Sequence, residues 1–281
     1  MRKKTTYLAP PSTGWQKITL VLLLLFALLV VSPFIIMLLS SFRTTSEMMK
    51  FPNHVLPIDW TLNGYEKVFS RAPVFRWFLN SVIITGSVTI GVLFTSTLTG
   101  FIFAKYRFPM KELLFWILLS TMMIPSQVTL IPSFLIINRL GWYNRLIALI
   151  VPSLVSVFGI FLARQFIEEI PDDLCSAGLI DGCGSWGLYF RVILPQIRPA
   201  ISALAIFTFL GTWNDYLGPL IMLNDVDRMT LPLALTFFNT NHSMDLGATM
   251  SAATLVMFPV IVVFLAFQKQ FVKGISITGM K

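Results

Sequence analysis

Long uninterrupted apolar runs alternate with shorter polar segments along this chain. Six of these runs come close to, or exceed, the length of about 20 residues that an α-helix needs to cross a bilayer. They cover residues 18–42, 77–104, 113–138, 146–163, 201–223 and 246–268. The pattern therefore predicts an all-α, polytopic membrane protein with six transmembrane helices.

Composition agrees with this interpretation, because 56% of the 281 residues are hydrophobic and only 12% are charged. A soluble globule of this size would not hide so much apolar surface. The net charge of +8 comes from Lys and Arg that are scattered over the termini and the short segments between runs, rather than gathered on one face. Nucleic acid is therefore not an expected partner, whereas membrane lipid is.

The basic residues also predict an orientation, since Lys and Arg near the ends of spans favour the cytoplasmic side. If the N-terminus is inside, 13 of the 21 Lys and Arg face the cytoplasm and 8 face outward. The first run is too long for the h-region of a signal peptide, so we interpret it as a retained anchor. We expect a multi-pass protein of a bacterial-type cytoplasmic membrane with both termini in the cytoplasm.

This topology divides the chain into three parts. Residues 1–76 would hold the N-terminal cytoplasmic tail, the first transmembrane helix and an external segment. Residues 77–268 would form a core of five transmembrane helices that includes a cytoplasmic loop at residues 164–198. Residues 269–281 would form a cytoplasmic C-terminal tail.

The first half of the loop predicts a short helix at residues 171–180. Pro171 suits the first helical position, and Asp172 and Asp173 would complement the helix dipole in the first turn. Asp181 followed by Gly182 is typical of a helix stop. Small residues at positions 176–178 would let another protein approach the backbone closely, or would pack against this chain's own helices.

The second half of the loop predicts another short helix at residues 186–194. Ser185 would cap its start, and Pro195 would end it as the chain returns to the bilayer. The whole loop carries three Arg against five acidic residues, a net charge of −2 on an otherwise basic face. Such a surface suits a soluble partner with a basic groove.

The loop is similar to the "EAA" loop of inner-membrane permeases from binding-protein-dependent ABC importers. The matching positions are Pro171, Leu174, Ala177, Ile180, Asp181, Gly182, Ile193, Leu194 and Pro195. The chain departs from the family at the Glu-Ala-Ala positions, where it has Ser176, Ala177 and Gly178. The resemblance implies that an ATPase subunit contacts Pro171, Leu174, Ser176, Ala177, Gly178, Ile180, Asp181 and Gly182.

Other landmarks resemble the shorter permease subunit of maltose-type carbohydrate importers. They are the sequence at residues 39–43, Asn80-Ser81, Trp213-Asn214-Asp215-Tyr216, Leu231-Pro232-Leu233 and the tail from Gln268 to Lys281. The resemblance implies the MetI-like permease fold and transport of a carbohydrate, with an oligosaccharide as the first choice. The implied partners are a homologous second permease, two ABC ATPase subunits and an extracytoplasmic solute-binding protein.

Energy for transport has to come from these partners, because the chain has no G-x-x-x-x-G-K-[ST] loop to hold nucleotide phosphates. We therefore expect no cofactor on this chain, with ATP and Mg on the partner subunits. Cys175 and Cys183 are eight residues apart without a nearby His, a spacing that matches no common metal site.

Asp215 is the one acidic residue inside an apolar run. An ionisable group at membrane depth is costly unless it faces protein or water, so it marks a candidate translocation path or gate. Together with Trp213, Asn214 and Tyr216 it would either contact a sugar or bond locally to shape the outer gate. We favour the local role.

Two other classes of function deserve comparison. A membrane enzyme would need catalytic groups at membrane depth, but His54 and His242 lie in predicted external loops and no H-E-x-x-H pattern occurs. An ion-coupled carrier or a channel would need more polar groups along the spans than Asp215 supplies. We expect a transport subunit rather than an enzyme.

Overall fold

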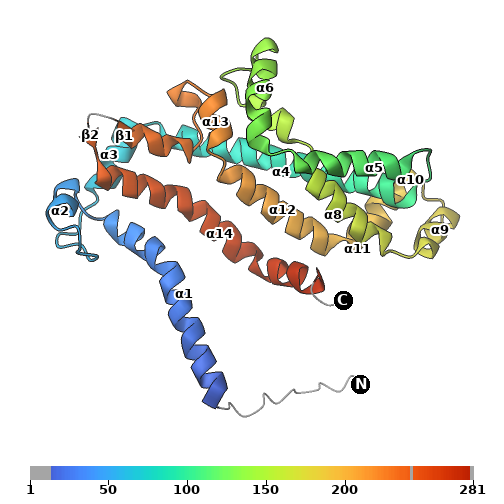
Figure 1. Ribbon diagram of the computed structural model, residues 1–281, viewed down its shortest axis with the longest axis horizontal. Coiled ribbons are helices and arrows are strands. Elements are labelled where there is room, and N and C mark those ends of the chain that lie inside the picture. The colour runs from blue at the N-terminus through green and yellow to red at the C-terminus, as the bar shows by residue number, and fades with distance from the viewer. Residues whose placement is uncertain (1–13, 241–242, 279–281) are drawn as a thin grey trace.

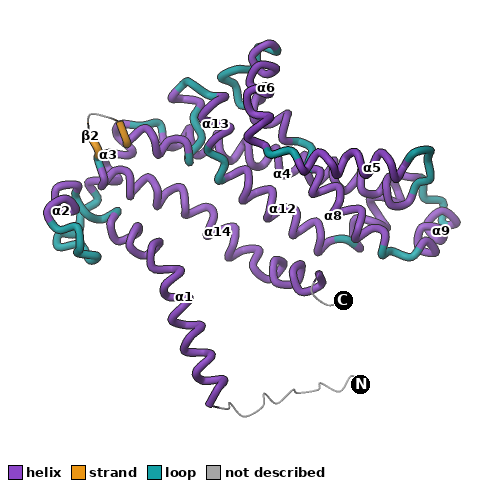
Figure 2. Tube along the Cα trace, in the orientation of Figure 1, coloured by secondary structure: helices purple, strands orange, loops and turns teal. Residues whose placement is uncertain are grey.

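The computed structural model describes residues 14–240 and 243–278 (Figure 1). Expectations that rest on residues 1–13, on His242 or on residues 279–281, including the two chain ends, lie outside the described residues. Helices make up most of the described chain, and the segment between α2 and α3 is a longer loop (Figure 2).

The α-helices are α1 Gly14–Ser40, α2 Thr45–Lys50, α3 Asn63–Arg71, α4 Val74–Lys105, α5 Lys111–Ser120, α6 Ser126–Arg139, α7 Ile147–Ile150, α8 Val157–Glu168, α9 Asp172–Ile180, α10 Ser185–Gly187, α11 Leu194–Gln196, α12 Arg198–Trp213, α13 Leu217–Met222 and α14 Leu246–Thr278. A π-helical segment covers Leu188–Ile193, and 3-10 turns cover Thr121–Met123, Val151–Ser153, Val226–Arg228 and Leu233–Phe238. Two short antiparallel strands, β1 Asn239–Thr240 and β2 Ser243–Met244, precede α14.

Four described helices are long and apolar enough to cross a membrane. They are Gln16–Ser40, Val74–Lys105, Ile147–Glu168 and Leu246–Ala266. Two bent pairs also qualify, Lys111–Met123 with Ser126–Arg139 at 98° and Ser185–Gln196 with Arg198–Trp213 at 81°. The described chain thus holds six spans if each bent pair counts as one, and the predicted all-helical, multi-span class is confirmed.

The third apolar run is not the straight helix that residues 113–138 suggest. The chain bends by 98° where the turn at Thr121–Met123 meets α6. Pro125 occupies the N-cap position of α6 with an extended ψ of 133°. Proline has no N–H to continue the preceding helix, and it disfavours helical backbone in the residue before it, Ile124, so the break falls here.

The fifth apolar run also differs from the prediction of one helix over residues 201–223. α12 ends at Trp213, and α13 begins at Leu217. In the break, the carboxylate of Asp215 accepts a hydrogen bond from the Gly218 N–H at 3.2 Å. Such local side-chain bonds compete with the helical backbone pattern, so Asp215 lies between two helices rather than within one.

α4 is the central helix of the bundle, and α8 packs along it. A Cβ atom at Gly100 would lie 2.7 Å from the Cβ of Ala163, so only glycine permits this approach. Buried clusters follow the bundle from end to end. One surrounds Trp77 and Trp213, a second surrounds Val88 and Leu204, and a third, beside the 164–198 loop, surrounds Ile167, Tyr189 and Ile193.

α1 leans away from the bundle (Figure 1). None of its most apolar 18-residue stretch is buried within this chain, so these side chains are available to lipid or to other subunits. Its C-terminal end is attached, because the Ser251 hydroxyl donates to the Ser41 carbonyl oxygen at 3.0 Å and the Ser41 and Tyr65 hydroxyls bond at 2.8 Å.

The segment between α1 and α4 is organised around Arg43, whose side chain is 3% exposed. Its guanidinium bonds to Glu47 at 2.7 Å and donates to the carbonyl oxygens of Phe51 and His54. Burial works to raise the pKa of Glu47, but hydrogen bonds from the Ile58 N–H and from Arg43 hold that pKa below its usual value. The segment is therefore a folded cap rather than a loose loop.

Candidate functional site

The first half of the 164–198 loop forms α9, close to the predicted helix. Pro171 occupies the N-cap position, with ψ at 138°, instead of the first helical position. Asp172 and Asp173 lie in the first turn as predicted. The one-residue difference is within the usual uncertainty of helix ends, and the missing proline N–H is tolerated at either position.

The end of α9 confirms the predicted stop. Gly182 has a φ of +83°. Its N–H donates to Leu179 O at 3.0 Å, and the Cys183 N–H donates to Gly178 O at 2.9 Å. This pair of bonds is the Schellman motif, which depends on a left-handed residue after the helix.

The side chains of α9 divide into two faces. Leu174, Leu179 and Ile180 are exposed, Ile180 to 86%. Ser176 and Ala177 are also exposed, whereas Gly178 is buried. A Cβ atom at Gly178 would come within 2.7 Å of Leu188, so this glycine packs against the second half of the loop. Three exposed apolar side chains on one short helix make α9 a candidate surface for another protein.

The second half of the loop differs from the predicted helix at residues 186–194. Gly184 holds the N-cap position, and Ser185, which was expected to cap, lies inside α10 and makes no side-chain cap bond. Helical turns then continue through the π-helical segment and α11 to Gln196. Pro195 does not end the helix, because it occupies the first turn of α11, where a missing N–H is tolerated.

Two basic residues that sequence reasoning did not single out hold the loop in place. The Lys105 ammonium donates to the Ile170 carbonyl oxygen at 2.5 Å and to the Asp172 carboxylate at 2.6 Å. The hydrogen bond and charge of Lys105, with a further effect of the Arg107 charge, lower the pKa of Asp172. Arg164 bonds to Glu168 and Glu112 and lies 3.9 Å from the centre of the Phe115 ring.

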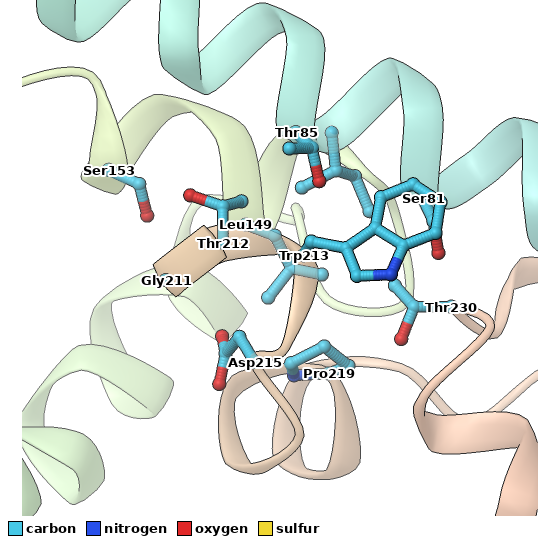
Figure 3. A pocket seen from close by; sticks show the side chains of 11 residues that line it. Ser81, Thr85, Leu149, Ser153, Gly211, Thr212, Trp213, Asp215, Pro219 and Thr230 are labelled. Atoms are coloured by element: carbon cyan, nitrogen blue, oxygen red, sulfur yellow. The ribbon is translucent and has the colours of Figure 1, made fainter. Parts of the chain in front are cut away.

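A polar cavity of about 220 Å³ lies among α4, α12 and α13 (Figure 3). Its lining residues are Ser81, Ile84, Thr85, Leu149, Ser153, Gly211, Thr212, Trp213, Asp215, Pro219 and Thr230. The buried hydroxyl of Thr230 has no hydrogen-bond partner among the described residues. A buried polar atom normally has a partner, so this hydroxyl is an exception beside the cavity.

A second cavity of about 240 Å³ adjoins the first. It is lined by Val88, Val92, Ser153, Ser156, Phe158, Leu204, Phe207, Thr208, Gly211 and Thr212. Ser153, Gly211 and Thr212 belong to both cavities. Of the described residues that line the pair, Asp215 alone is charged, and most of the other polar groups are hydroxyls.

Two of the four predicted path residues line the first cavity, and one of these two also packs between helices. Trp213 is 2% exposed, stacks on Phe209 at 5.7 Å and donates from its indole N–H to Val256 O at 3.2 Å, so it ties α12 to α14. Trp213 and Asp215 line the first cavity, whereas Asn214 and Tyr216 do not.

The serine and threonine residues of the cavities were missed because a single hydroxyl in an apolar run is common and carries no spacing signal. Only the packing of α4, α8 and α12 brings these hydroxyls together.

A multi-span helical bundle with a polar internal cavity and an exposed apolar side chain on a polar loop has the architecture of a membrane transport subunit. Residues 96–277 match the family described as binding-protein-dependent transport system inner membrane component. The chain belongs to this family.

Relatives extend the similarity over most of the chain. An arabinooligosaccharides transport system permease protein, AraQ, of Halalkalibacterium halodurans is 30% identical over 91% of this chain and 92% of its own length. A diacetylchitobiose uptake system permease protein, NgcG, of Streptomyces coelicolor is 31% identical over 91% of this chain and 85% of its own length.

A solved structure shares the fold. It is the crystal structure of a bacterial ABC transporter involved in the import of the acidic polysaccharide alginate. One of its chains superposes with a TM-score of 0.80 at 20% identity, covering 93% of this chain and 99% of that one. The MetI-like permease fold implied by the sequence is therefore confirmed.

Proposed function

We propose that this chain is one of two permease subunits in an ATP-driven importer that carries an oligosaccharide across the cytoplasmic membrane by alternating access. The observation that carries the proposal is the pair of adjoining cavities lined by hydroxyl groups and Asp215. Hydroxyls donate and accept hydrogen bonds, which matches the chemistry of sugar hydroxyls. The names of the two relatives describe oligosaccharide transport, which supports this choice of substrate class.

The loop at residues 164–198 would couple this permease subunit to one of the two ATPase subunits. Its support is the exposed Leu174, Leu179 and Ile180 on a helix with a fixed Schellman end. A rigid helix that presents apolar side chains suits insertion into a groove of a soluble partner. Closure of the ATPases on ATP and Mg would then move α9 and shift the permease pair between inward- and outward-facing states.

The partners follow from the same proposal. A homologous second permease would complete the translocation path, and an extracytoplasmic binding protein would deliver the sugar. Exposed apolar surface on α1 supports a membrane location and contact with lipid or with another subunit. The charge bias of the sequence supports an orientation with both termini in the cytoplasm.

The test is purification of the chain together with its proposed partners and reconstitution in vesicles. We expect ATP hydrolysis that rises when sugar-loaded binding protein is added, and sugar uptake that requires ATP. A panel of neutral oligosaccharides offered to the binding protein would identify the substrate. Uptake driven by this chain alone, without ATPase subunits, would contradict the proposal and favour an ion-coupled carrier or channel.

A further inference from the structure

One helix, α4, contacts both parts of the proposed machinery. Its 32 residues correspond to about 48 Å at 1.5 Å per residue. In Figure 1 it runs along the bundle toward the end where α9 and α10 lie. Its N-terminal turns bind the segment at residues 226–231, and its last residue binds the start of α9.

The N-terminal end of α4 holds residues 226–231 through the backbone of that segment. The Trp77 indole N–H donates to Val226 O at 2.6 Å. The Asn80 amide donates to the carbonyl oxygens of Asp227 and Met229, both at 3.0 Å.

Ser81 continues the same contact, because its hydroxyl accepts from the Leu231 N–H at 2.8 Å. Thr230, within this segment, lines the polar cavity. The position of α4 therefore determines the position of one wall of the cavity.

The C-terminal end of α4 holds the coupling helix through Lys105, whose side chain is 10% exposed. The ammonium bonds to Ile170, between α8 and α9, and to Asp172, the first residue of α9. An exposed ion pair alone contributes little, but a mostly buried ammonium with a second bond to a backbone carbonyl fixes the corner where α9 leaves the bundle.

The helix between these ends has the properties of a rigid rod. Its sequence contains no proline. It packs closely on α8 at two positions one turn apart, since a Cβ at Gly159 would lie 2.3 Å from the Ser96 hydroxyl and one at Gly100 would lie 2.7 Å from the Cβ of Ala163. A displacement of one end is therefore transmitted along the packed part of the helix, and no proline kink absorbs it.

We propose that Lys105 is a positioning residue that links movement of α9 to the 226–231 segment through α4. The inference rests on the proposed coupling of α9 to an ATPase. When the ATPases close, α9 pulls on Lys105, α4 moves as one body, and Trp77, Asn80 and Ser81 shift the cavity wall. Without the ammonium, α9 moves but α4 does not follow.

The experiment compares hydrogen exchange in the complete reconstituted complex without nucleotide and after trapping with vanadate and Mg-ATP. In the wild type, trapping should change exchange in residues 170–180 and in residues 226–231. Lys105→Met keeps the length of the apolar stem and removes the donors. The variant should retain the change at 170–180 and lose it at 226–231, and stimulation of ATP hydrolysis by loaded binding protein should fall by about fivefold or more.

Two further variants separate positioning from general damage. Lys105→Arg keeps a charged donor and should restore most of both responses. Lys111→Met removes an ammonium whose hydrogen bond to the Ala104 carbonyl oxygen is long, at 3.4 Å. This variant should behave as the wild type. An unchanged response at 226–231 in Lys105→Met would overturn this inference and leave the proposed coupling of α9 to an ATPase intact. A wild-type complex that responds in neither segment would overturn the proposed coupling, and the inference with it.

Discussion

At the scale of single residues, Gly182 is the position where backbone conformation and proposed function meet. Its φ of +83° strains any residue with a side chain, at a cost of about 1–2 kcal/mol. A Cβ there would meet nothing within 4 Å, so the chain itself leaves space that a partner can occupy. The residue is thus required by the turn and not by packing within this chain.

We predict that Gly182→Asp inserts in the membrane at normal abundance but fails to transport. The side chain strains the turn that ends α9 and places a charge at the proposed docking surface. Sugar uptake and stimulated ATP hydrolysis in membranes would measure the effect.

The matched control is Gly184→Asp, which adds the same charge two residues away. Gly184 has a φ of −74° and open space around its Cβ position, so no left-handed strain arises. We expect a much smaller defect in this variant. Equal loss in both variants would assign the effect to charge alone, and normal uptake by Gly182→Asp would contradict a role of the turn in coupling.

Asp215 is the residue where the sequence left two roles open, and the structure supports both. Its carboxylate bonds to Gly218 and also lines the cavity. We predict that Asp215→Asn lowers the rate of transport without changing which sugars are accepted, because the amide oxygen can still accept the Gly218 bond. Competition uptake with several sugars would test this, and a switch of preference would instead make Asp215 a principal sugar contact.

At the scale of elements, Asp245 joins three helices. It accepts from Thr45 in α2 at 2.7 Å, from Lys67 in α3 at 2.8 Å and from the Ala248 N–H in the first turn of α14. Burial works to raise its pKa, but the bonds from Lys67, Thr45 and Ala248 and the Lys67 charge lower the pKa overall. The Asp245 carboxylate is therefore one of the contacts that fasten the folded cap outside the spans to α14, beside the Ser251–Ser41 and Gly247–Thr45 hydrogen bonds.

We predict that Asp245→Asn lowers the free energy of unfolding by about 1–2 kcal/mol at neutral pH, because bonds to a charged acceptor are lost. Since the folded-state pKa is lowered, the wild-type advantage is full above the ordinary value of 3.8 and disappears as pH falls through the lowered pKa. Thermal unfolding of the purified protein at several pH values would measure it. Asp59→Asn, at an exposed position in the same segment, should have little effect, and an equal loss there would exclude a specific role for Asp245.

At the scale of the whole molecule, the proposed topology places α2 and α3 on the opposite side of the membrane from α9. α4 separates these two ends of the bundle (Figure 1). The basic residues of the sequence support this orientation, and the structure keeps the two sets of elements at opposite ends.

In a variant in which Cys175 and Cys183 are replaced by Ser, we predict that single cysteines near residue 1 and residue 281 are protected from an impermeant reagent in intact cells. A cysteine at Asn53, exposed in the segment between α2 and α3, should be labelled. Lys67 is not suitable for labelling, because its ammonium bonds to Asp245. A cysteine replacing Ser176 in α9 should be labelled only after the cells are opened, and labelling in intact cells would reverse the topology.

The sequence by itself determined the helical membrane class, the approximate positions of the apolar runs and the end of α9. These depend on local properties, namely the length of an apolar run and the ability of Gly182 to adopt a left-handed backbone. The family resemblance was readable for the same reason, since its motif is contiguous in the loop. The bends at Pro125 and at Asp215 were harder to predict, because a proline or a polar residue in an apolar run permits a break without requiring one.

The tertiary structure alone decided which residues meet across the bundle. Lys105 and Asp172 are far apart in the chain, and they pair because α4 and α8 pack closely enough to bring their ends together. The cavity hydroxyls come from α4, α12 and the turns around them, and each is unremarkable in its own segment. Local sequence specifies helices through short-range backbone and side-chain preferences. A cavity, or an ion pair between two helices, exists only once separate helices have packed at fixed distances.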